Sequence, residues 1–439
     1  MKNRRWISAL IGGFGVRAGE VGAKFALYML AARLMTAGEC GLLFLCMSWG
    51  ALAATAARLG VDRALSRLIA AELAVEQGRR ALAVLCQGAA IAVASGLLLG
   101  GLTFAAAPLA AGLVFHQPAA ADSLRAAALL IPALSLAVTL DFALIGFART
   151  SMSQILQNLF WPVAMLAALL LGVRSAPLML MVMAASQMAA IVAAAALIGM
   201  DRRIGADRPS EHAPLPSLWR TARPLFVVEL VQMSLVSLPT LLLGAFADPE
   251  AVGIFSIAQR ASMLVLVVLL SVSVLAAPRF SEFHRLGDWD GLASLNRRTQ
   301  LAGLLFGGGL CLCLAALART FLSLLGAGYE AGRSTLLILL AGQAVNALYA
   351  AQDYMLMMTG QGAALQLINL GQFLLIAFLG AALIPSLGAT GAALATAAAT
   401  AFGAIGTATT VRALYPRATP YLTFDPPDKL TAFMQRRAT

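Results

Sequence analysis

Apolar stretches of about 20 residues recur from one end of this 439-residue chain to the other. A helix of about 20 residues rises roughly 30 Å, the thickness of the hydrocarbon core of a bilayer. Apolar residues make up 60% of the chain and charged residues 12%, about half the share usual in soluble domains. Inside lipid the backbone has no water to bond, so each stretch must satisfy its own N–H and C=O groups as a helix. The chain is therefore predicted to be an all-α integral membrane protein.

The apolar stretches predict about twelve transmembrane helices in two sets of six. The first set is Ile7–Leu34, Gly41–Ala57, Ala81–Phe104, Leu124–Phe147, Gln154–Val173 and Leu178–Met200. The second set is Pro224–Phe246, Val252–Ala277, Leu301–Leu317, Ser334–Met358, Ala363–Ile384 and Ala389–Val411. We expect residues 1–200 and 224–411 to form two six-helix bundles, joined by a cytoplasmic linker at 201–223 and followed by a cytoplasmic tail at 412–439.

An internal repeat relates the two sets. A shift of 212 positions aligns Asp141 with Asp353 and Gln154 with Gln366, and the aspartates lie in the fourth span of each set. Transporters often build a binding site between such repeats. Because each set has an even number of spans, the repeats are expected to share one orientation in the membrane.

Orientation follows from the basic residues, which are enriched in cytoplasmic loops. With the N-terminus inside, 23 of the 31 Lys and Arg residues lie in inner segments and five in outer segments. Both termini are therefore predicted to be cytoplasmic, in the inner membrane of a bacterium. The basic start at Lys2, Arg4 and Arg5 is not read as a cleaved signal peptide, because the following stretch carries Arg17, Glu20 and Lys24.

Three charged residues lie in the interior of the first span, apart from Arg33 at its outer end. Arg17, Glu20 and Lys24 are separated by three and four residues, so a helix places them on one face. Charges inside a membrane are expensive and usually face a polar interior or a water-filled cavity. These three residues either neutralise one another within the helix or line such a cavity.

Polar residues at related places in the second set are Glu229 and Gln232 in the seventh span and Arg260 in the eighth. Together with the first span they predict a central cavity that is net positive. A cavity of this kind suits an anionic headgroup, and arginine donates paired hydrogen bonds to phosphate.

Three further residues have two open interpretations each. Arg58, at the inner end of the second span, either guards the cytoplasmic mouth of the cavity or anchors the span. Asp141 and Asp353 either bind a coupling ion, H⁺ or Na⁺, or pair with neighbouring helices. No other cofactor and no metal site are expected.

The net charge of +11 does not indicate nucleic-acid binding, because the basic residues are divided among loops between spans. A membrane enzyme such as a saccharide polymerase needs catalytic groups outside the membrane. The largest outer segment, about 105–123, offers only His116 and Asp122, so no catalytic residue is expected. A non-catalytic scaffold leaves the intramembrane charges unexplained.

Short motifs along the chain resemble the polysaccharide flippases, the O-antigen type exporters of the multidrug/oligosaccharidyl-lipid/polysaccharide superfamily. The stretches that carry the resemblance are Ala32–Leu42 before the second span, Arg58–Ala64 after it, and Ala251–Arg260 at the start of the eighth span. In the third stretch, Phe255 stands where the family usually has tyrosine. Gly326–Glu330 and Thr359–Gln361, on either side of the tenth span, are also similar to the family.

The resemblance implies a V of two six-helix bundles around a cavity that opens alternately to either side. It implies a flippase that moves a polyprenyl-diphosphate-linked oligosaccharide from the cytoplasmic to the outer leaflet, for polysaccharide (O-antigen, lipopolysaccharide) biosynthesis. Its partners would then be the lipid-linked oligosaccharide, membrane lipid and polysaccharide polymerase machinery. Related lipid II flippases carry cavity arginines on the first and eighth spans, where Arg17, Lys24 and Arg260 lie here. The alternatives are a lipid II flippase and a cation-coupled exporter of drugs and toxic compounds with the same fold.

Overall fold

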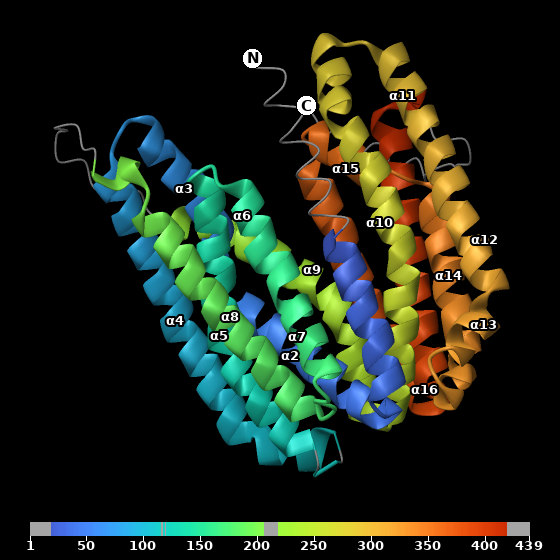
Figure 1. Cartoon of the computed structure of the whole chain (residues 1–439). Helices are drawn as coiled ribbons and strands as arrows, with labels where there is room; N and C mark the ends of the chain where they lie inside the picture. The colour runs from blue at the N-terminus through green and yellow to red at the C-terminus, as the bar shows by residue number, and fades with distance from the viewer. Residues whose placement is uncertain (1–18, 116, 119, 206–217, 419–439) are drawn as a thin grey trace. The chain divides into compact units, whose positions relative to one another are not determined.

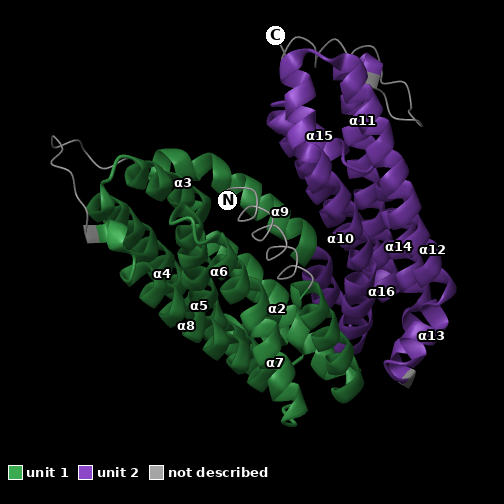
Figure 2. Ribbon diagram, turned by 45° about the horizontal axis from the view of Figure 1, so that its top comes forward, with its two compact units in different colours: residues 1–237 green, residues 238–439 purple. Residues whose placement is uncertain are grey.

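The computed structural model describes residues 19–115, 117, 118, 120–205 and 218–418 (Figure 1). This part of the chain is almost entirely helical, which confirms the predicted all-α class. The chain forms two compact units, residues 1–237 and 238–439 (Figure 2). The boundary between them falls inside α9 (Leu218–Phe246). The predicted division at the linker 201–223 stays a prediction.

Unit 1 contains the first half of the predicted spans. Residues 19–34 are helical, and 1–18 lie outside the described residues. The elements that follow are α2 (Ala37–Arg58), α3 (Val61–Ala74), α4 (Gly78–Leu109), η1 (Ala110–Val114), α5 (Ala120–Gly146), α6 (Thr150–Gln154), η2 (Ile155–Leu159), α7 (Phe160–Leu170), α8 (Ala176–Gly199), η3 (Arg202–Gly205) and the first part of α9.

Unit 2 begins in the second part of α9. Its remaining elements are α10 (Pro249–Leu286), α11 (Trp289–Ala302), η4 (Gly303–Gly308), α12 (Gly309–Ala316), α13 (Ala318–Ser323), η5 (Ala327–Gly332), α14 (Arg333–Leu348), α15 (Gln352–Met358), α16 (Gly362–Leu414) and η6 (Pro416–Ala418). Within this unit α14 packs against both α10 and α16.

The predicted number of about twelve spans is confirmed. In the described part of the chain nine helices are long and apolar enough to cross a membrane, and a bent pair, Gly328–Leu348 with Gln352–Met358, makes a tenth. One of the nine, α16, has 53 residues, or roughly 80 Å at 1.5 Å per residue, and its backbone is non-helical at Gly388. It therefore supplies two spans, and the helical residues 19–34 belong to the first span.

The middle of unit 1 is α5, which packs against α2, α3, α4 and α8, and Figure 1 shows α4, α5 and α8 running side by side. Small residues let α4 come close to α5: a Cβ at Gly100 would lie 2.7 Å from the backbone oxygen of Ala128. The Ser135 hydroxyl of α5 donates to the Ala92 carbonyl of α4 at 3.1 Å. Small residues and interhelical hydrogen bonds are what hold helices together in lipid, where burial of apolar surface gives little driving force.

A tight turn joins α2 to α3. Leu59 and Gly60 both have left-handed backbone conformations, with φ of 52° and 75°. A Cβ at Gly60 would lie 2.5 Å from the Ala222 carbonyl oxygen and 2.6 Å from the Phe226 nitrogen, both in α9. Glycine at this position therefore allows both the turn and the close packing of α9 onto it.

Gly60→Ala is expected to lower the free energy of unfolding by about 2 kcal/mol or more, because the new methyl group meets the α9 backbone and φ is positive. Thermal unfolding of the purified protein in detergent measures the change. Gly101→Ala is the matched control, because a Cβ there has no neighbour within 4 Å. Equal unfolding temperatures for the two variants would contradict this account of the turn.

Candidate functional site

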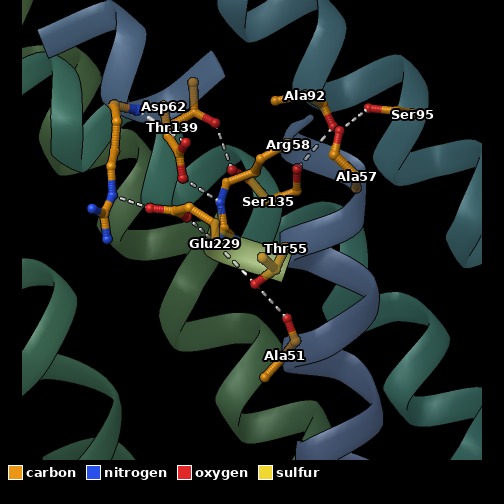
Figure 3. Close-up of polar contacts among 11 residues, drawn as sticks. Ala51, Thr55, Ala57, Arg58, Asp62, Ala92, Ser95, Ser135, Thr139 and Glu229 are labelled. Carbon is orange, nitrogen blue, oxygen red and sulfur yellow. Dashed lines mark hydrogen bonds and ion pairs between the residues drawn. The ribbon is translucent and has the colours of Figure 1, made fainter. Parts of the chain in front are cut away.

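A buried charge cluster lies where the turn between α2 and α3 meets α9 (Figure 3). Nε of Arg58, the last residue of α2, donates to Oδ2 of Asp62 at 2.6 Å, and its Nη2 donates to the Thr55 hydroxyl at 3.0 Å. The same Nη2 lies 3.9 Å from Oε2 of Glu229 in α9. Arg58 and Glu229, both predicted from the sequence as cavity residues, are thus brought together as an ion pair.

Arg63 completes this cluster. Its Nε pairs with Oε1 of Glu229, and its backbone N–H donates to Oδ1 of Asp62 at 2.9 Å. Two guanidinium groups therefore face two carboxylates, and Asp62 is fully buried. Buried charges are tolerated only when they are paired and hydrogen-bonded in this way. The Glu229 charge is consequently neutralised from α2 and α3.

Asp62 and Arg63 were not among the site residues predicted from the sequence. They lie within the stretch Arg58–Ala64, and the signal was the spacing of four between Arg58 and Asp62. That spacing normally pairs side chains along one helix. Here it pairs them across the Leu59–Gly60 turn, which the sequence pattern alone did not place against α9.

A second cluster surrounds Lys24 on the helix formed by residues 19–34. Its ammonium lies 2.8 Å from Oε1 of Glu20, one turn earlier on the same helix. It also donates to Oδ1 of Asn158 at 3.4 Å and lies 5.6 Å from the centre of the Trp161 ring. Asn158 lies in η2, a π-helical turn, and such turns occur frequently at functional sites. Neither Asn158 nor Trp161 was predicted from the sequence, and Arg17 lies outside the described residues.

The two repeat-related aspartates have different surroundings. Asp141 in α5 is half-buried, Ser153 of α6 hydrogen-bonds its carboxylate, and its Oδ1 has no hydrogen-bond partner. Asp353 in α15 is exposed. The sequence repeat is thus not matched by equivalent environments, and an ion-binding role for either residue stays a prediction.

The remaining predicted residues belong to separate units. Gln232 lies in the part of α9 that belongs to unit 1 and is exposed. Arg260 lies in α10 of unit 2, is half-buried, and donates from Nη1 to the Ser256 carbonyl at 3.3 Å. Their assignment as cavity residues stays a prediction.

Outside the spans, Asp201 lies two residues after the end of α8. Arg203 donates from Nε and Nη2 to the Asp201 carboxylate at 3.0 and 2.8 Å, and Nη2 of Arg149 lies 3.5 Å away. The hydrogen bonds from Arg203 lower the pKa of Asp201 to about 2, and the charge of Arg149 adds to this effect. Because the folded pKa lies below the unfolded value of about 3.9, this stabilisation is complete above that value. The stabilisation is lost as the pH falls through about 2, because the Asp201 carboxylate is then protonated.

Within the described ranges, no three His, Cys, Asp or Glu side chains gather as metal ligands. The charged clusters contain carboxylates already held by guanidinium or ammonium groups. Their chemistry is that of ion pairing.

Comparison with known families identifies the family of the chain. Residues 15–284, more than half of the chain, match the family model described as polysaccharide biosynthesis protein. No curated protein sequence matches. This family match confirms the resemblance inferred from the sequence motifs.

Several solved structures share the fold at low sequence identity. An inward-facing multidrug resistance MATE family transporter of the MOP superfamily has a TM-score of 0.68 and 13% identity, covering 96% of both chains. The inward closed lipid II flippase MurJ has a TM-score of 0.64 and 14% identity, covering 92% of this chain and 87% of MurJ. A MOP superfamily transporter from Pyrococcus furiosus has a TM-score of 0.57 and 14% identity, covering 90% and 91%.

Asp62→Asn is expected to lower the free energy of unfolding by about 3 kcal/mol, because it leaves the buried Arg58 without its closest counter-charge. Asp122→Asn is the matched control: Asp122 pairs with Arg125 at 3.1 Å but is exposed, so its loss is expected to cost below about 1 kcal/mol. Denaturant titration of both purified variants measures the difference. Equal losses would show that the α2–α3–α9 cluster contributes no more than a surface pair.

Proposed function

Because the chain belongs to the polysaccharide biosynthesis protein family, we propose that it is a flippase for a polyprenyl-diphosphate-linked oligosaccharide. The lipid-linked saccharide passes from the cytoplasmic to the outer leaflet by alternating access. The fold is that of a multi-pass MOP-type transporter, shared with MATE transporters and MurJ. No catalytic step and no cofactor other than a coupling ion are part of the proposal.

The observation that carries this proposal is the placement of Lys24. Its ammonium is held on a transmembrane helix by Glu20, Asn158 and the face of Trp161, and its side chain remains partly accessible. A fixed cation inside the membrane suits the diphosphate of a lipid carrier, while the prenyl chain stays in lipid. Arg17 and Arg260, the other cations predicted in the first and eighth spans, keep their predicted role in binding the anionic headgroup.

Neutralisation of Glu229 strengthens the case for an anionic substrate. The sequence predicted Glu229 as an acidic residue of the cavity, and Arg58 and Arg63 pair with it. An exporter of organic cations needs a net acidic lining, and this acid is already satisfied. The Pyrococcus furiosus transporter is described as having a binding pocket of reverse polarity and a different function, so this fold accommodates more than one charge preference.

The proposed flippase role also implies a membrane location and a partner enzyme. The excess of Lys and Arg in the predicted inner segments supports an inner-membrane location with both termini cytoplasmic. A flippase for lipid-linked saccharides delivers its product to the outer leaflet. The enzyme class that consumes it there is a polysaccharide polymerase, as O-antigen and lipopolysaccharide synthesis require.

Asp141 is the better placed of the two aspartates for the coupling ion. It is half-buried in α5, and one of its carboxylate oxygens has no partner. A carboxylate in this setting takes up H⁺ or Na⁺ to remove the cost of an uncompensated charge. Asp353 is exposed, so we assign it the lesser role.

Charge reversal at Arg17, Lys24 and Arg260 together is expected to abolish surface polysaccharide while leaving the protein in the membrane. Surface glycan and membrane-bound protein are both quantified in a strain that lacks its own copy of the gene. Arg125→Glu is the control, because Arg125 is exposed and pairs with Asp122. Normal export by the triple variant would rule out the assignment of these cations.

Asp141→Asn is expected to remove the dependence of transport on an ion gradient, because the amide neither binds a proton nor carries a charge. Proteoliposomes with an imposed H⁺ or Na⁺ gradient measure this dependence, and Asp353→Asn is the repeat-related control. If Asp141→Asn responds to both gradients as the wild type does, coupling does not pass through Asp141.

A further inference from the structure

The Lys24 cluster has two kinds of partner. Asn158 and Trp161 come from a different span, in η2 and α7, and approach Lys24 over a sequence distance of more than 130 residues. Packing also joins these segments, since a Cβ at Gly19 would contact Leu159. Glu20 lies on the same helix as Lys24, four residues earlier. Two partners therefore fix the position of the ammonium, and the third supplies its counter-charge.

Among the three partners of Lys24, the Glu20 carboxylate is the one that another anion can replace. An ammonium has three N–H donors, and here the carboxylate, the amide oxygen and the aromatic face occupy its surroundings. The side chains of Lys24 and Glu20 are 26% and 19% exposed, so the pair is less buried than the pair of Arg58 and Asp62, whose side chains are 9% and 0% exposed. Ion pairs of this spacing stabilise a helix only weakly.

Arg58, the last residue of α2, shows the contrast. Arg58 holds Asp62, which is fully buried, and it also reaches Glu229 on a second helix. Displacing a carboxylate from that cluster would leave a buried charge without a partner, which is costly. Arg58 and Lys24 are thus suited to different tasks: Arg58 to holding helices together and Lys24 to exchanging anions.

We propose that Glu20 is a built-in competitor for the headgroup site on Lys24. Without substrate, the Glu20 carboxylate occupies the ammonium. A diphosphate, which carries more charge and more acceptor oxygens than one carboxylate, displaces it, and the return of Glu20 helps to release the headgroup. Asn158 and Trp161 are positioning residues that keep the ammonium in place during the exchange. The inference rests on the proposed flippase function and deepens it.

Without such a role, Glu20 would only oppose the binding of an anionic headgroup. A purely attractive site would bind a diphosphate tightly and release it slowly. A weak internal anion lowers affinity and returns the site to its ion-paired state after each passage. The expected signature is therefore a gain of affinity when the acid is removed, which a merely structural residue does not give.

The test measures binding of farnesyl diphosphate, with farnesol as the uncharged control, to the full chain in lipid nanodiscs by calorimetry. Glu20→Gln is expected to tighten diphosphate binding by about tenfold, because the competing charge is gone. Lys24→Gln is expected to lose the preference for diphosphate over farnesol. The exchanged variant Glu20→Lys with Lys24→Glu keeps the ion pair and its helix but moves the cation away from Asn158, so it too is expected to lose the preference.

The outcomes separate the two proposals. If the wild type prefers the diphosphate and Glu20→Gln binds it equally or more weakly, the competitor role is wrong while the flippase function stands. If neither the wild type nor Glu20→Gln distinguishes farnesyl diphosphate from farnesol, the proposed function fails and this inference with it. Thermal unfolding of each variant in the same nanodiscs identifies any change that arises from misfolding. The difference in tryptophan fluorescence between the wild type and Trp161→Phe gives the signal of Trp161, which lies beside Lys24.

Discussion

The packing of α2, α3 and α9 in unit 1 depends on the ion pairs that Arg58 makes with Asp62 and Glu229. They join the last residue of α2, the first turn of α3 and the middle of α9 at a point where Gly60 lets the backbones touch. Because α9 continues into unit 2, the helix that these pairs hold is also the connection between the two units. Lys24 has a less buried partner, Glu20, and is the cation to which we assign anion exchange.

Hydropathy was sufficient to predict the fold, because lipid imposes one solution on long apolar stretches. About twelve spans, the all-helical class and the family were all predicted from the sequence and are confirmed. Local breaks were predicted only in part. The non-helical backbone at Gly388 falls between the predicted spans Ala363–Ile384 and Ala389–Val411. The bend between α14 and α15 falls inside the predicted span Ser334–Met358, where hydropathy gave no signal for it.

The site was predicted only in part, because sequence spacing reports neighbours on one helix. It placed Glu20 and Lys24 on one face of a helix, where they form an ion pair, and left open whether they neutralise one another or line a cavity. Glu229 pairs across helices with Arg58 and Arg63, and no spacing rule predicts such contacts. Asn158 and Trp161 were missed for the same reason. The Asp141 and Asp353 alignment predicted equivalent residues, but packing gave them different exposure.

The central claim is that the cations of this transporter serve an anionic, lipid-linked saccharide. The most direct measurement reconstitutes the purified chain in proteoliposomes and follows two fluorescent probes, a polyprenyl-diphosphate-linked saccharide and a lipophilic organic cation. Access of an impermeant quencher to each probe reports its movement between leaflets. The account predicts that the wild type accelerates leaflet exchange of the saccharide lipid and that Lys24→Gln does not. Acceleration of the cation alone, or of neither probe, would contradict it.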